Sequence, residues 1–196
     1  MDAFNLLKED HRKVEELFEQ LESSRGAAKL RVFEQIKMEL DLHTHIEEKI
    51  FYPALEKPRQ THDLTLEAYE EHDVVKKLLK EMSKAKSATE EWEAQGKVLQ
   101  ENVEHHVEEE ENELFPKAQS ALSEEEIEEL GEEMAAEKNR KQKGAAASKN
   151  GASKSASKTK SASTAQKRAV SKAGKTSGSK KAASGSRSKK SAAKKR

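Results

Sequence analysis

The sequence predicts an all-α protein: an up-down-up-down four-helix bundle with a short fifth helix and a disordered basic tail. Two observations carry this prediction. Apolar residues recur at alternating spacings of three and four along four long stretches, as they do on the buried face of a helix. The chain also repeats itself, since Glu9-Asp10-His11 matches Glu70-Glu71-His72 and segment 43–53 matches segment 106–116, each 61 to 63 residues later. A helical hairpin used twice, with short connections, favours antiparallel neighbours.

Charge divides the chain into regions. Residues 1–140 carry all 37 Asp+Glu and 19 Lys+Arg, whereas residues 141–196 carry 18 Lys+Arg and no acid. From Lys141 onward the composition is mainly Ala, Ser, Lys, Gly and Thr, which cannot bury enough apolar surface to offset the entropy of ordering. We therefore expect a bundle over residues 1–120, a short acidic helix over 121–140 and a disordered tail over 141–196.

The composition excludes several classes of protein. The absence of cysteine excludes disulfides, cysteine-type zinc sites and iron–sulfur clusters. The first residues do not combine a basic region with a long apolar one, so no secretory signal is predicted. No apolar run approaches the roughly 20 residues that span a bilayer. We expect a cytoplasmic protein with no membrane association.

The first hairpin is predicted from two amphipathic stretches. The first helix covers residues 1–23 and ends before a glycine stop at Gly26. One polar residue, a histidine, interrupts its buried face of Phe4, Leu7, His11, Val14, Phe18 and Leu21. The second helix runs from about residue 27 to 55, with Pro53 kinking or ending it. Two polar residues interrupt its face of Phe33, Ile36, Leu40, His43, Glu47, Ile50 and Ala54.

The second hairpin follows the same pattern. Asp63 is the expected N-cap of the third helix, whose face consists of Tyr69, His72, Val75 or Lys76, Leu79 and Met82. Ser87 and Glu90 have capping-box spacing at the start of the fourth helix. Its face consists of Trp92, Leu99, Val103, His106, Glu110 and then Glu113 or Leu114, with Pro116 mirroring Pro53.

The fifth helix is expected to begin at Ser123, because Glu126 follows three residues later with capping-box spacing. It carries Ile127, Leu130 and Met134 on one side.

Six polar residues on these buried faces predict a metal centre. They are His11, His43, Glu47, His72, His106 and Glu110. A lone histidine on an apolar face is more often a hydrogen-bonded core residue than a ligand. Here, however, each half also has a His-xxx-Glu pair, which places an imidazole and a carboxylate one turn apart on one helix face. Two buried carboxylates would repel each other, and a pair of divalent cations removes that cost.

The ligand types predict which cations bind. Mixed imidazole and carboxylate ligation suits iron first, with manganese or zinc as weaker alternatives. Two bridging glutamates and two histidines per ion leave open positions for a small ligand such as dioxygen, peroxide or nitric oxide.

These residues resemble those of the hemerythrin-like family, also called HHE cation-binding domains. The resemblance covers about residues 1–120 and rests on Asp10-His11, Glu71-His72 and the two segments His43 to Pro53 and His106 to Pro116. It implies a non-haem di-iron centre in a four-helix bundle. The implied ligands are the four histidines named above, with Glu47 and Glu110 as bridges.

Two positions stay open within this resemblance. Oxygen-carrying hemerythrins have a further histidine where this chain has Lys76, and a carboxylate ligand where Glu111 stands, so Glu111 competes with Glu110 as the ligand. The remaining histidines, His45, His62 and His105, lie off the predicted buried faces and are expected at the surface or behind the ligands.

The tail resembles the Lys/Ala/Ser-rich tails of linker-histone-like proteins in composition. Its 18 cations would bind duplex DNA irrespective of sequence, through the release of counterions. The alternative is a tail that docks on the acidic bundle of the same chain.

The sequence therefore predicts a di-iron protein that binds or senses dioxygen or a related molecule, or handles iron. Association with DNA through residues 141–196 would place it at the nucleoid. Two alternatives remain open: a di-iron oxidase or peroxidase, and a DNA-binding structural protein in which the metal only stabilises the fold.

Overall fold

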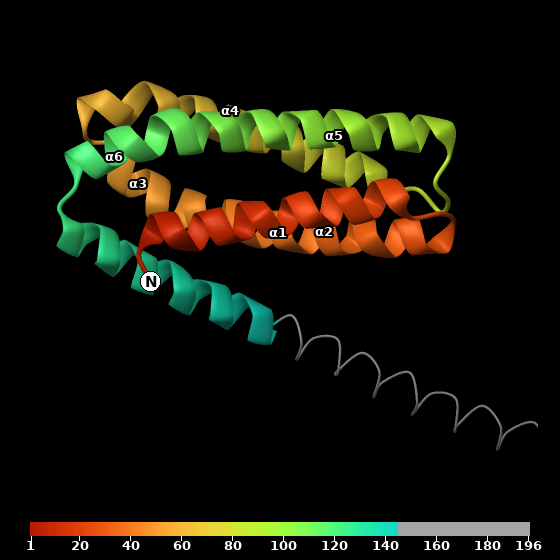
Figure 1. Cartoon of the computed structure of the whole chain (residues 1–196), viewed down its shortest axis with the longest axis horizontal. Coiled ribbons are helices and arrows are strands. Elements are labelled where there is room, and N and C mark those ends of the chain that lie inside the picture. Colours follow the sequence, from red (N-terminus) through yellow and green to blue (C-terminus); the bar gives the residue numbers. More distant parts are fainter. Residues whose placement is uncertain (145–196) are drawn as a thin grey trace, which may run out of the picture. The chain divides into compact units, whose positions relative to one another are not determined.

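The computed structural model describes residues 1–144 and confirms the predicted helical bundle. The four long helices are α1 (Ala3–Ser23), α2 (Ala27–Ile46), α4 (Arg59–Met82) and α5 (Glu90–Glu109). They run up, down, up and down, and the α1–α2 and α4–α5 connections lie at the same end of the bundle (Figure 1). No strand occurs within residues 1–144, and no helix there is long and apolar enough to span a bilayer.

Each of the two His-to-Pro segments leaves the regular α-helix in the same way. A π-helical turn, η1 (Glu47–Phe51), separates α2 from the short α3 (Tyr52–Leu55). Its counterpart η2 (Glu110–Leu114) separates α5 from α6 (Phe115–Ala121). The predicted helix over 27–55 is therefore present with these bounds, but the π-helical turn inside it was not predicted. Each π-helical turn is followed by a proline that lacks the N–H needed by the regular ladder.

Two predicted helix starts were also wrong. Pro58 precedes α4, so Asp63 lies within that helix rather than at its N-cap. The cap of α5 is Thr89, whose hydroxyl accepts a hydrogen bond from the Trp92 N–H at 3.2 Å, instead of Ser87. Pro58 favours a helix start directly after it, because its ring fixes φ near the helical value, so Asp63 is not needed as a cap. Thr89 directly precedes the first residue of α5, whereas Ser87 lies two residues further away, so Thr89 is the cap.

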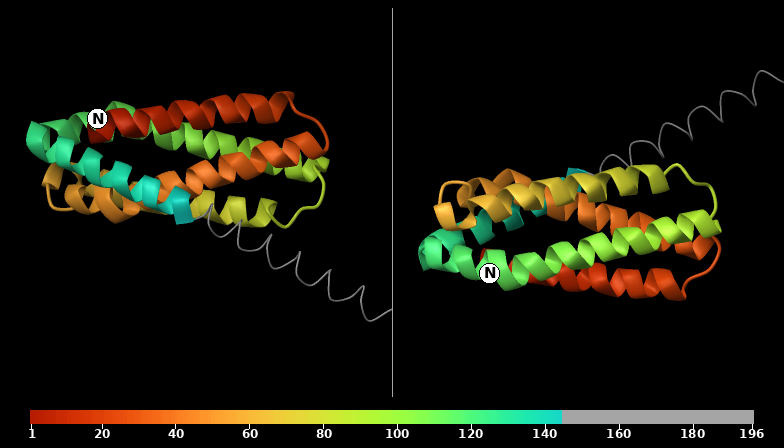
Figure 2. Two further views of the ribbon diagram at one scale, coloured as in Figure 1. Left: turned by 90° about the horizontal axis from the view of Figure 1, so that it is seen from below. Right: turned by 90° about the horizontal axis from the view of Figure 1, so that it is seen from above.

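The predicted fifth helix, which follows α6 and is not the α5 of Figure 1, is longer than predicted. It begins at residue 124 and continues to residue 144, the last described one. The predicted capping box is present, because Glu126 accepts from the Ser123 N–H at 2.8 Å. The helix lies outside the bundle, on the side of α1 and α2 (Figures 1 and 2). Residues 141–144 of the predicted disordered tail are therefore helical, and the rest of that tail, 145–196, lies outside the described residues.

The apolar core consists of two clusters. One lies towards the α1–α2 and α4–α5 connections and includes Phe33, Leu79 and Trp92. The other lies towards α3 and α6 and includes Tyr52, Leu114 and, from the fifth helix, Met134. The polar residues of the predicted metal centre fall between these clusters.

Candidate metal centre

All six predicted ligands are buried in the middle of the bundle, with exposed fractions between 0% and 5%. The four histidines come one each from α1, α2, α4 and α5. Glu47 and Glu110 are the first residues of the two π-helical turns. Each half of the chain thus supplies two imidazoles and one carboxylate to the same interior space.

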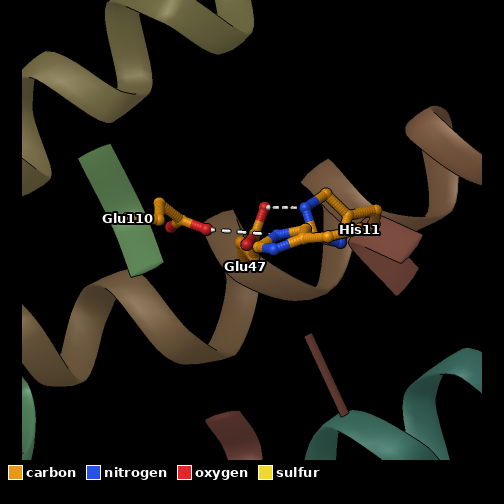
Figure 3. A group of neighbouring side chains, drawn as sticks. His11, Glu47 and Glu110 are labelled. Atoms are coloured by element: carbon orange, nitrogen blue, oxygen red, sulfur yellow. Dashed lines mark ion pairs between the residues drawn. The ribbon is translucent and has the colours of Figure 1, made fainter. Parts of the chain in front are cut away.

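Each glutamate links histidines from both halves. Glu47 Oε2 lies 3.1 Å from His43 Nε2 and 3.2 Å from His72 Nε2. Glu110 Oε2 lies 3.4 Å from His11 Nε2 and 3.8 Å from His106 Nε2. Figure 3 shows the Glu110 carboxylate pointing at His11, with Glu47 beside them. This is the arrangement in which a carboxylate bridges two neighbouring cations.

The six residues form two adjacent groups of ligand atoms. His11, His43, Glu47 and Glu110 place one ligand atom each within 4.8 Å of the others, and Glu47, His72 and His106 do the same. Glu47 belongs to both groups. The geometry therefore offers two neighbouring cation positions with His11 and His43 at one, and His72 and His106 at the other.

The donor atoms at this centre fit divalent cations because several have no other partner. His11 Nε2, both oxygens of Glu47 and Glu110 Oε2 are buried and lack a hydrogen bond. An unpaired buried polar atom costs about 1–3 kcal/mol, and more when charged. A cation that these atoms coordinate would remove that cost.

The outer nitrogens of three ligand histidines each face a carboxylate. His11 Nδ1 lies 2.8 Å from Glu111, His72 Nδ1 lies 3.0 Å from Glu48, and His106 Nδ1 lies 2.7 Å from Glu71. A carboxylate behind a ligating histidine fixes its tautomer and increases its basicity. Glu48 in turn pairs with Lys76.

Glu110 and Glu111 take different positions relative to the ligand atoms. Glu110 belongs to the buried group of ligand atoms, whereas the Glu111 side chain is 31% exposed and lies against the outer face of His11. The placement favours Glu110 as the bridge and gives Glu111 the supporting position behind a histidine.

Sequence reasoning missed Tyr52 as a residue of the centre. Its buried hydroxyl donates to Glu110 Oε1 at 3.0 Å and lies 3.2 Å from His72 Nε2. Phe115 occupies the equivalent place in the other half, so the tyrosine–phenylalanine difference between the two repeats was the available signal.

The electrostatics of the cation-free centre are strongly perturbed. Burial and the neighbouring Glu110 raise the pKa of Glu47 well above its usual value. Burial also acts on Glu110, but His106 and His11 outweigh it, so the pKa of Glu110 is lowered. Burial would lower the pKa of His11, yet Glu110 raises it to about 9. The pKa values of the two carboxyl groups are thus shifted in opposite directions, and a cation bound by Glu47 would favour its deprotonated form.

A small void adjoins the centre. Its volume is about 10 Å³, and all four ligand histidines line it together with Val14, Leu40, Thr44, Val75, Val103 and Val107. A surface groove of about 380 Å³ between α1 and α5 shares His11, Val14, Val103 and Val107 with it. Only side chains therefore separate the void from solvent on this side.

The remaining histidines lie away from the buried groups, in agreement with the expectation for them. His45 Nε2 lies 2.7 Å from Glu137 of the fifth helix, and His62 Nδ1 lies 2.9 Å from the Glu56 carbonyl. His105 is exposed and lies 3.4 Å from Glu109.

Comparison with known proteins gives consistent results. A family model described as the hemerythrin HHE cation binding domain matches residues 2–118. An uncharacterised protein of Mycobacterium tuberculosis is 32% identical over 143 residues, which cover 69% of this chain and 84% of that protein. The crystal structure of a hemerythrin HHE cation binding domain-containing protein from Mycobacterium kansasii superposes with a TM-score of 0.63 at 27% identity, covering 71% of this chain and 86% of that one.

A DNA nickase of Nostoc sp. is also similar. It is 30% identical over 141 residues, which cover 71% of this chain but only 40% of the relative. The chain therefore spans less than half the length of that protein.

Proposed function

This chain belongs to the hemerythrin HHE cation-binding family, and we propose that it holds a pair of iron ions between the four long helices. His11 and His43 would bind one ion, His72 and His106 the other, and Glu47 and Glu110 would bridge them. The observation that carries the proposal is the pair of adjacent groups of buried ligand atoms, which have Glu47 in common and include several atoms without a hydrogen bond. A mixed imidazole and carboxylate donor set suits iron, with manganese and zinc as weaker candidates.

We further propose that the centre binds or senses a small ligand of the size of dioxygen, peroxide or nitric oxide. A di-iron pair supplies redox chemistry and open coordination positions to such a ligand. The void beside the four histidines has room for about one water-sized molecule, and half of the residues that line it are aliphatic. An apolar wall excludes water and favours a small neutral guest. Handling of iron itself is the alternative use of the same residues.

Metal analysis tests this proposal. The purified chain, loaded anaerobically with ferrous iron, should retain about two ions per chain after desalting, because the bundle offers two positions. Its absorption spectrum should change when dioxygen or nitric oxide is admitted. Retention of less than one iron per chain, with manganese or zinc retained fully, would contradict the choice of iron.

The Tyr52 hydroxyl favours a second candidate, a di-iron oxidase or peroxidase. It holds a proton at Glu110 within the centre, where a substrate oxygen could receive it. Steady-state consumption of hydrogen peroxide distinguishes the sensor from the oxidase or peroxidase. Sustained turnover that Tyr52→Phe slows while iron content holds would favour the enzyme, and a single stoichiometric reaction would favour the sensor.

We also propose that residues 141–196 associate the protein with duplex DNA. The segment carries 18 Lys+Arg and no acid, and the similar Nostoc protein is a DNA nickase. Counterion release from phosphates would supply the affinity without reading sequence. Docking of the tail on the acidic bundle, and a purely structural role for the metal, are the competing accounts.

A further inference from the structure

One ligand histidine differs from the other three in its outer contact. His43 Nδ1 lies 3.8 Å from Asp10 Oδ2, which is too long for a hydrogen bond, whereas the other three outer contacts measure 2.7–3.0 Å. Both His43 Nδ1 and Asp10 Oδ2 are buried and unpaired. Asp10 therefore lies behind His43 but does not form a hydrogen bond with it.

The other oxygen of Asp10 is held from outside the bundle. Asp10 Oδ1 accepts a hydrogen bond from the Lys138 ammonium group of the fifth helix. Asp10 is 6% exposed and the Lys138 side chain 19% exposed, so this ion pair is shielded from solvent.

The fifth helix cannot easily shift relative to Asp10. Gly131 lies so close to the backbone of Met1 and Asp2 that no Cβ fits there. Glu137, the residue next to Lys138, has its Oε1 atom 2.7 Å from both His45 Nε2 and Lys49 Nζ. These contacts fix the position of the lysine along the bundle.

We propose that Lys138 is a positioning residue for the metal centre, because through Asp10 it sets the hydrogen bond to His43. The packing of the fifth helix thereby controls one ligand at one of the two cation positions. This inference rests on the proposed function. Lys138 lies beyond residues 2–118, which match the family model, so this control is an addition to the cation-binding domain.

The physical reason is competition for one carboxylate. A histidine that binds a cation through Nε2 carries its proton on Nδ1, and in His43 this proton points to Asp10. The Lys138 ammonium withdraws negative charge from Asp10 and restrains its rotation, so His43 is the least supported of the four imidazoles. Without the ammonium group of Lys138, Asp10 can rotate towards His43 and accept a hydrogen bond from its Nδ1–H.

Nuclear magnetic resonance of the full-length, zinc-loaded chain tests this directly. Zinc is diamagnetic, and long-range ¹H–¹⁵N correlation of labelled histidine reports each Nδ1–H separately. Lys138→Met should move the His43 Nδ1–H resonance downfield and leave those of His72 and His106 unchanged. Lys138→Arg should restore the wild-type position, because it keeps the charge.

Two matched variants control for other effects. Lys76→Met removes the ammonium group from Glu48 and should move only the His72 signal, which shows that the method detects such a contact. Lys49→Met removes another ion pair of the fifth helix but does not touch Asp10, so it should leave all four ligand signals in place. In an Asp10→Asn background, Lys138→Met should no longer move the His43 signal, because the lysine acts on His43 only through this carboxylate.

An unchanged His43 signal in Lys138→Met, or a shift spread evenly over all four rings, would overturn the proposal. A shift of the same size in Lys49→Met would overturn it too, because helix packing alone would then explain the effect. A wild-type chain that binds no zinc or iron would instead overturn the metal centre itself, and this inference with it.

Discussion

Tyr52 and Phe115 occupy equivalent positions in the two halves of the chain and differ by one hydroxyl group. That hydroxyl donates to Glu110, while Glu47 receives no equivalent hydrogen bond and both its oxygens are unpaired. One carboxylate of the centre therefore accepts a hydrogen bond from a tyrosine hydroxyl, and the other does not. We expect Glu47 to be the more adaptable bridge.

We predict that Tyr52→Phe destabilises the metal-free protein by roughly 1–2 kcal/mol, because a buried carboxylate oxygen loses its donor. Urea unfolding in the presence of a chelator measures this. Tyr69→Phe removes a more exposed hydroxyl, which donates to Glu56 at 3.1 Å, and should cost well under 1 kcal/mol. Equal losses in the two variants would contradict the role given to Tyr52.

The pH dependence of the metal-free protein follows from two histidines. Burial lowers the pKa of His43 from 6.5 to about 4, so this histidine destabilises the folded protein as the pH falls from about 6.5 towards 4. The raised pKa of His11, about 9, has the opposite sign: its stabilisation is lost as the pH rises from about 6.5 through 9.

We therefore predict that these two histidines destabilise the metal-free chain at opposite ends of the range, His43 as the pH falls towards 4 and His11 as it rises towards 9, while the raised pKa of Glu47 favours the acid side. Each histidine contributes a loss on the order of 3 kcal/mol at its own end. Denaturant unfolding at a series of pH values measures the curve. A stability that is constant from pH 4 to pH 9 would contradict these shifts.

At the scale of elements, the two π-helical turns place the two glutamates of the proposed metal centre. Glu47 and Glu110 each begin one of these turns, and a proline follows each turn, at Pro53 and Pro116. The missing proline N–H removes one bond of the regular ladder and makes the wider turn less costly. The duplicated proline is thus part of the structural basis of the site rather than a simple helix stop.

The fifth helix depends on a close approach at Gly131. We predict that Gly131→Ala destabilises the chain by about 1–3 kcal/mol, since the new methyl group meets the backbone of Met1 and Asp2. Gly144→Ala is the control, because nothing lies within 4 Å of its added Cβ. Thermal unfolding and limited proteolysis compare the two, and equal stability would show that the helix is not packed as described.

For the whole molecule, the periodicity of apolar residues was sufficient to predict the bundle and its topology. It also predicted the interior position of the six polar residues, because His11, His43, Glu47 and their repeats interrupt otherwise apolar faces. The π-helical turns could not be predicted this way, since one extra residue per turn barely changes a short pattern. The contact between Asp10 and Lys138 was equally inaccessible, because it joins residues 128 positions apart.

Deletion of residues 145–196 tests the proposed role of the tail. We predict that residues 1–144 keep the full metal content and lose duplex DNA binding, because they retain the excess of acid. The full chain should bind two unrelated duplexes equally, with affinity falling steeply as salt rises. Binding by the shortened chain as tight as by the full one, or no binding by the full chain at low salt, would contradict this role.

Iron content across a set of single variants tests the central proposal most directly. The wild-type chain should hold about two irons, as the two positions between the helices require. His43→Ala and His106→Ala remove one ligand from each position and should reduce this content sharply, whereas His45→Ala should not change it, because His45 contacts only Glu137. Full iron content in both His43→Ala and His106→Ala would contradict the metal centre described between the four helices.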